Sequence, residues 1–187
     1  MADTADNIRV LIADDHEISR AGYIRMLSVD PAIEIAGEAS NGAEAVELTG
    51  FLAPDIVILD MKMPGIDGKT AAGIIREKYP SVKIILIISY DCYHSLGDAL
   101  RLGLDGYLAL DICTFDLIEA IHKVYDGRKI IYKNILKFIK SRNNNGKFMP
   151  EHDRGNLLLK LPEVMEYVNG DYLKVFADKT TEINFLH

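Results

Sequence analysis

Three aspartates stand directly after two apolar runs of this sequence. The run at residues 56–59 stops at Asp60, and the run at residues 8–13 stops at Asp14 and Asp15. Short apolar runs bounded by turn signals are typical of buried strands, and open parallel sheets bind their ligands where such strands end. We therefore expect the three carboxylates at one edge of a sheet, with Asp60 as the candidate reactive group.

The three carboxylates would repel one another in such a cluster unless a cation neutralised their charge. Hard oxygen ligands with few other donors suit Mg²⁺, which is therefore the cofactor that we expect. Two structural explanations stay open at this point. An aspartate at position 60 is also suited to starting a turn, and Asp14 and Asp15 stand where a helix needs a cap.

The elements that would position these aspartates alternate along the first 126 residues. Apolar runs predict strands, and apolar residues at helical spacing predict helices between them. The alternation predicts a parallel sheet with helices on both faces. The expected strands cover residues 8–13, 33–39, 56–60, 83–89 and 106–110, and the expected helices cover 16–28, a segment capped by Asn41, 69–79, a segment ending near 101, and 114–125.

Three segments share their order and spacing with a known family. They are Ala13-Asp14-Asp15-His16, Asp60-Met61-Lys62-Met63-Pro64-Gly65-Ile66-Asp67-Gly68 and Asp105-Gly106-Tyr107-Leu108. Through them the first two thirds of the chain resembles the receiver domain of bacterial response regulators, CheY-like in fold and similar to the NarL/FixJ group. The resemblance implies a doubly wound, five-stranded parallel α/β sheet of order 2-1-3-4-5. It also implies a response regulator of a two-component phosphorelay signalling system.

The resemblance assigns a role to each residue of the acid cluster. Asp60 would be the phosphoacceptor, taking a phosphoryl group from a histidine kinase or phosphotransfer protein. Asp15 would bind Mg²⁺ directly, Asp14 would hold a metal-bound water, and Asp60 and the backbone carbonyl of Lys62 would complete the protein's ligands. Asp67 is interpreted as a turn acid. No enzyme activity is expected beyond self-phosphorylation of Asp60 from a phosphodonor.

Two positions depart from the family pattern. Ile88 stands where receivers carry threonine or serine, and Leu110 stands where they carry lysine. Ser89, one place later, should not simply replace the missing hydroxyl, because neighbouring strand residues face opposite sides of the sheet. Tyr107 stands where the resemblance places the aromatic residue of the switch. Each missing contact to a phosphoryl group would contribute about 1.5 to 3 kcal/mol. We therefore expect phosphoryl transfer, or its readout, to be weakened by roughly a hundredfold or more.

The remainder of the chain is expected to form a basic helix and linker at 127–148 and a small helical tail at 149–187. Between residues 127 and 150 lysine and arginine accumulate and no acidic residue occurs, while Ile131, Ile135 and Phe138 form an apolar stripe that predicts a sixth helix. Another helix is expected over 162–168. The tail resembles a truncated or degenerate LuxR-type helix-turn-helix, so DNA binding through a complete motif is not expected.

Composition narrows the class of protein. The chain has 187 residues and a formal net charge of -7, which argues against general affinity for nucleic acid or membranes. The acidic start is not a secretory signal, and no apolar run reaches the length of a membrane span. Cys92 and Cys113 have neither metal-ligand nor disulfide spacing, so two free thiols and a cytoplasmic location are expected.

Several functions compete at this stage. The leading interpretation is a response regulator; whether it forms a homodimer stays open. One alternative is a pseudo-receiver that works without phosphate, as a protein-interaction module. Another is a transcriptional regulator that binds DNA through its tail and residues 128–147, with salt-dependent affinity. A magnesium phosphohydrolase is disfavoured, because Lys62 stands where such enzymes need a second acid.

Overall fold

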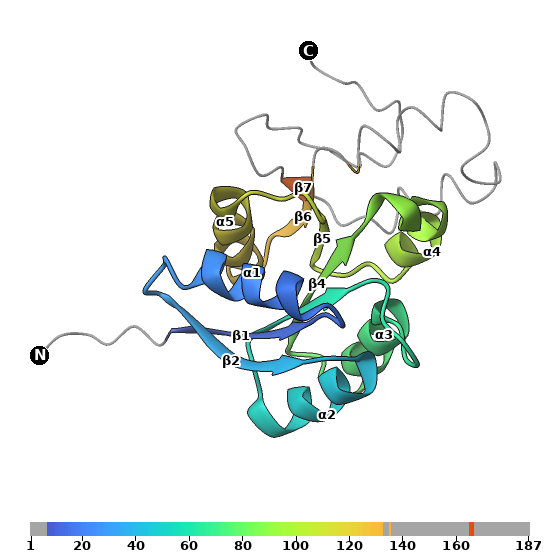
Figure 1. Ribbon diagram of the computed structural model, residues 1–187, viewed down its shortest axis with the longest axis horizontal. Coiled ribbons are helices and arrows are strands. Elements are labelled where there is room, and N and C mark those ends of the chain that lie inside the picture. Colours follow the sequence, from blue (N-terminus) through green and yellow to red (C-terminus); the bar gives the residue numbers. More distant parts are fainter. Residues whose placement is uncertain (1–6, 133–134, 136–164, 167–187) are drawn as a thin grey trace, which may run out of the picture.

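The computed structural model in Figure 1 describes residues 7–132, 135 and 165–166. A parallel sheet crosses the molecule, with α1 and α5 side by side on one face and α2 and α3 together on the other (Figure 1). The helices are α1 (Glu17–Leu27), α2 (Gly42–Leu52), α3 (Gly68–Lys78), α4 (Leu96–Arg101) and α5 (Thr114–Tyr125), and a 3-10 helix, η1, spans Tyr90–Ser95.

All strand pairs of the sheet are parallel, in the order β2-β1-β3-β4-β5-β6-β7. The first five strands follow the predicted order 2-1-3-4-5, which confirms the predicted doubly wound α/β fold. The strands are β1 (Ile8–Ala13), β2 (Ile33–Ala39), β3 (Ile56–Asp60), β4 (Lys83–Ile88), β5 (Gly106–Ala109), β6 (Lys129–Ile131) and β7 (Met165–Glu166).

The uniformly apolar sequences of β3 and β4 explain why these strands lie in the middle of the sheet. Every residue of β3 is buried, and in β4 only Lys83, at its start, is not. A strand covered by helices on both faces has no solvated side on which polar residues would be favoured. The one carboxylate of β3, Asp60, stands at its last residue, at the edge of the sheet where the strand ends.

The sheet has two strands beyond the five that the sequence predicts, and residues 129–131, at the start of the expected basic helix, form one of them. Gly127, at φ 85°, ends α5, and the next residues form β6 beside β5. Ile130 and Ile131 are buried there, so Ile131, which was assigned to the apolar stripe of a helix, lies in the sheet instead. A run of three apolar residues fits both the helical and the strand periodicity. Without β6, one edge of β5 would present unpaired backbone groups, so pairing with a further strand is favoured.

The helix expected over 162–168 is also wrong at the two positions that the structure describes. Met165 and Glu166 form β7, which pairs with Lys129 and Ile130 of β6. The remaining residues of the expected basic helix, linker and tail lie outside the described residues, apart from Tyr132 and Ile135. Ile135 is helical, as expected there, and its N–H donates to the carbonyl of Tyr132 at 3.0 Å. Within the described part of the chain, no helix is long and apolar enough to span a membrane.

Candidate functional site

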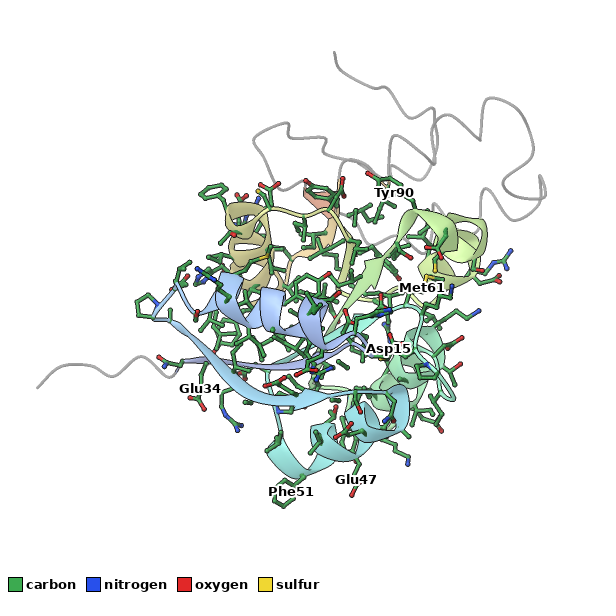
Figure 2. The ribbon with its side chains drawn as sticks, in the orientation of Figure 1. Asp15, Glu34, Glu47, Phe51, Met61 and Tyr90 are labelled. Carbon is green, nitrogen blue, oxygen red and sulfur yellow. The ribbon has the colours of Figure 1, made fainter. Side chains whose placement is uncertain are left out.

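The carboxyl ends of β1 and β3 bring the predicted acids together. Ala13 and Leu59 are register partners in these neighbouring strands, so the residues that follow them, Asp14 and Asp60, lie at the same edge. In Figure 2 Asp15, Met61 and Tyr90 mark this side of the molecule, after β1, β3 and β4. A cleft of about 600 Å³ opens there and is lined by Asp14, Asp15, His16, Ser19, Asp60, Lys62, Met63, Pro64, Ser89, Asp91 and Leu110. We call it the acid cleft.

Asp14 is buried at the base of the acid cleft, and Asp15 is exposed at its rim. Asp14 is 2% exposed, and its Oδ1 accepts a hydrogen bond from the backbone N–H of His16 at 2.7 Å. The His16 ring nitrogen Nδ1 lies 3.0 Å from Oδ1 of Asp15. The N-cap of α1 is His16 itself, without a side-chain capping bond, so helix capping does not explain the two aspartates.

Asp60 combines a turn contact with a place in the acid cleft. Its Oδ2 accepts a hydrogen bond from the backbone N–H of Lys62 at 3.2 Å, as expected of an aspartate that opens a turn. The side chain is nevertheless only 8% exposed. Burial, followed by the negative charge of Asp14, raises the pKa of Asp60 to about 7. A cation in the cleft would oppose both causes of this rise.

The turn after Asp60 depends on a close approach of two backbones. The backbone N–H of Gly68 donates to the carbonyl of Met61 at 3.1 Å, and a Cβ at position 68 would collide with the carbonyl of Asp60. Asp67 caps α3 by accepting a hydrogen bond from the N–H of Thr70 at 2.7 Å. This cap agrees with the interpretation of Asp67 as a turn acid.

Lys62 sends its side chain across the opening of the acid cleft. Its Nζ lies 3.3 Å from Oδ2 of Asp91, in the η1 segment after β4. The side chains are 74% and 64% exposed, respectively. Lys62 is the one lysine or arginine among the described residues that line this cleft.

Ile88 and Leu110, which depart from the family pattern, lie in different environments. Ile88 is fully buried at the end of β4, whereas Ser89 lines the acid cleft, because the alternation of faces no longer applies once the strand has ended. The Ser89 hydroxyl donates to Oδ1 of Asp91 at 2.5 Å. Leu110, 45% exposed, also lines the cleft and brings an apolar side chain there.

Tyr107 lies in the core rather than in the acid cleft. Its hydroxyl donates to the carbonyl of Ala99 at 3.0 Å and accepts from the N–H of Leu104 at 2.8 Å. Tyr107 thereby ties β5 to α4. Because the ring is fully buried, its pKa is raised above the ordinary value of a phenol.

Sequence reasoning missed two residues that bear on the cleft. Asp91 lines it, and the rule that loops after parallel strands share one edge would have found it three residues after Ile88. Tyr23 of α1 is buried, and its hydroxyl has no hydrogen-bond partner among the described residues. Burial and the charges of Asp14 and Asp60 raise the pKa of Tyr23. No sequence signal distinguishes this tyrosine from an ordinary core residue.

Fold and site together define a doubly wound α/β domain with an acidic cleft at the carboxyl edge of its sheet. Residues 10–122 match the family described as the response regulator receiver domain. The chain belongs to the response regulator receiver family.

Known relatives are two-component response regulators. The nitrate/nitrite response regulator NarL of Escherichia coli K12 is 30% identical over 85% of this chain and 74% of its own length. The response regulator VraR of Staphylococcus saprophyticus is 32% identical over 73% of this chain, which spans 64% of VraR. The solved receiver domain of NarL from Mycobacterium tuberculosis is 32% identical, with a TM-score of 0.60, and covers 66% of this chain and 99% of that domain.

Proposed function

We propose that Asp60 is the phosphoacceptor through which this receiver domain takes part in a two-component phosphorelay. The observation that carries the proposal is the pairing of buried Asp14 and Asp60 at the ends of neighbouring strands, inside a cleft that opens to solvent. An acceptor carboxylate needs both properties. It must be held in place, and a phosphodonor must be able to reach it.

The donors of the acid cleft fit Mg²⁺. Among the described residues, Asp14, Asp15 and His16 place possible ligand atoms within 4.8 Å of one another. The carboxylate of Asp60 and the backbone carbonyl of Lys62 would add further oxygens. The raised pKa of Asp60 points the same way, since burial and the negative charge of Asp14 both disfavour an ionised Asp60. We assign Asp15 and Asp60 as direct ligands and Asp14 as the acceptor for a metal-bound water. When bound, Mg²⁺ would neutralise charge on the carboxylates and on the phosphoryl group.

The residues of this chain would carry the transfer as follows. An ionised oxygen of Asp60 forms a bond to phosphorus while the bond between phosphorus and the donor's histidine nitrogen breaks, and that nitrogen keeps the electron pair. The product is an acyl phosphate on Asp60. The N–H of Lys62, now 3.2 Å from Oδ2, orients the carboxylate for this attack. The donor is a histidine kinase or a phosphotransfer protein, and we place the reaction in the cytoplasm.

A second function, a pseudo-receiver that signals by binding alone, is favoured by two positions. Ile88 contributes no group to the acid cleft, and Leu110 contributes an apolar one. A receiver of this kind would bind Mg²⁺ at the acids without accepting phosphate, and would act through a surface, such as a homodimer interface.

Intact-protein mass spectrometry after incubation with acetyl phosphate and Mg²⁺ separates the two functions. We expect a single phosphoryl adduct on the unsubstituted chain and on the Asp55→Asn control, and no adduct on Asp60→Asn. Asp55 stands at the opposite end of β3, where its Oδ2 accepts from the N–H of Arg9. Absence of the adduct, together with a rise in melting temperature on adding Mg²⁺, would overturn phosphorylation and support the pseudo-receiver.

A further inference from the structure

Among the described residues that line the acid cleft, Lys62 carries the one ammonium group, and this group lies against the exposed carboxylate of Asp91. Lys62 Nζ lies 3.3 Å from Asp91 Oδ2, and both side chains are mostly exposed. Ion pairs of this kind contribute little to stability, because water screens them and two long side chains must be ordered. Little free energy therefore holds Lys62 against Asp91.

Lys62 is also tied to the reacting group through its main chain. Its N–H donates to Oδ2 of Asp60, so its Cα stays next to the acceptor whatever the side chain does. Leu110 also lines the cleft and offers no charge. Phosphorylation would replace the single negative charge of the Asp60 carboxylate with about two on the phosphoryl oxygens, in a cleft that already contains Asp14 and Asp15.

Asp91 holds a second group that suits a phosphoryl oxygen. Its Oδ1 accepts from the Ser89 hydroxyl, while its Oδ2 faces Lys62 Nζ. One exposed carboxylate thus binds both the cation and a hydroxyl that line the acid cleft. A doubly charged phosphoryl group on Asp60 competes with a singly charged carboxylate for the same donors.

We propose that Lys62 leaves Asp91 when Asp60 is phosphorylated and binds the phosphoryl oxygens, supplying the counter-charge that position 110 lacks. This role rests on the proposed function of Asp60. Asp91 is then a competitor that holds Lys62 away from the empty site. In this receiver the cation comes from the loop after β3, two residues from the acceptor, rather than from the end of β5.

The test compares rates of adduct formation from acetyl phosphate and Mg²⁺, followed by mass spectrometry. Lys62→Gln keeps the backbone carbonyl and N–H but removes the ammonium, and should slow adduct formation by roughly ten- to a hundredfold. Lys62→Arg should retain most of the rate. Lys69→Gln is the matched control and should leave the rate unchanged. Lys69 lines a neighbouring cavity, which Lys62 and Asp91 also border, and is not among the residues that line the acid cleft.

Two further variants make the test specific for charge in the cleft. Adding Leu110→Lys to Lys62→Gln should restore much of the lost rate, because it returns an ammonium to the same cleft. Asp91→Asn should raise the rate above that of the unsubstituted chain. Equal rates for the unsubstituted chain and Lys62→Gln would overturn the role of Lys62 while leaving Asp60 as acceptor. No adduct on the unsubstituted chain would overturn the function of Asp60 and this role with it.

Discussion

The carbonyl group of Asp60 packs against the α-carbon of Gly68 so closely that no side chain fits at position 68. The contact joins the last residue of β3 to the first residue of α3. It fixes the loop that carries Lys62 and thereby the orientation of the Asp60 carboxylate. The glycine is required here by space, since its backbone angles are those of an ordinary helix start.

Gly68→Ala should therefore destabilise the domain by about 2 to 3 kcal/mol, as expected when an added group overpacks a rigid contact. Gly73→Ala is the control on the same helix, because a Cβ at position 73 meets nothing within 4 Å. That variant should gain about 0.5 to 1 kcal/mol from the better helix propensity of alanine. Urea unfolding measures both, and equal stabilities would show that the loop yields to the added methyl group.

Two buried tyrosines give opposite predictions for removal of a hydroxyl. Tyr107→Phe leaves the N–H of Leu104 buried without an acceptor and should cost about 1 to 3 kcal/mol. Tyr23→Phe removes a hydroxyl that has no partner among the described residues and should be neutral or stabilising by about 1 kcal/mol. Thermal unfolding of the two variants tests the contrast. A marked loss for Tyr23→Phe would mean that its hydroxyl is bound, for example by water near Asp14.

The sequence was sufficient to predict the first five strands and the acid cluster. Uniformly apolar runs such as 56–59 can be satisfied only in a strand covered on both faces. Parallel strands joined by helices then place Asp14 and Asp60 at one edge without any knowledge of side-chain contacts. Both predictions rest on local patterns that tertiary structure has little freedom to change.

The errors have a different origin, because they concern pairings between distant segments. Whether Ile130 and Ile131 join a helix or a strand depends on the free edge of β5, which no local pattern encodes. The pairing of Lys129 with Met165 is more remote still. Ser89 was assigned away from the cleft by strand alternation, but the strand ends one residue earlier, and strand ends are poorly defined by sequence.

A hydrogen bond between the loop before β2 and α5 predicts a pH-dependent contribution to stability. Oδ2 of Asp30 lies 2.7 Å from Nε2 of His122, and this hydrogen bond, followed by one from the N–H of Ala32, lowers the pKa of Asp30 below 3.8. A lowered carboxyl pKa stabilises the fold above 3.8, and the effect is lost as the pH falls through the folded-state value.

Asp30→Asn should therefore lower the free energy of unfolding at pH 7 by a few tenths to about 1 kcal/mol, since the pair is partly exposed. The difference from the unsubstituted chain should shrink towards pH 3. Urea titrations at both pH values measure it, with Glu34→Gln, an exposed acid on β2, as the control for net charge. A difference that is the same at both pH values would contradict a charge-dependent contact.

The raised pKa of Asp60 has the opposite consequence for stability. The folded state binds the Asp60 proton more tightly than the unfolded chain does. The contribution of Asp60 to the free energy of unfolding is therefore greatest below pH 3.8 and falls as the pH rises to about 7.

Asp60→Asn should remove this pH-dependent loss of stability. In chelator, the variant should exceed the unsubstituted chain by about 1 to 2 kcal/mol at pH 8, allowing for water in the open cleft, and by little at pH 4. Urea unfolding at the two pH values measures the gain, and Asp55→Asn is the control. If the stability difference between Asp60→Asn and the unsubstituted chain is the same at pH 8 and pH 4, Asp60 ionises in the cleft without a free-energy cost.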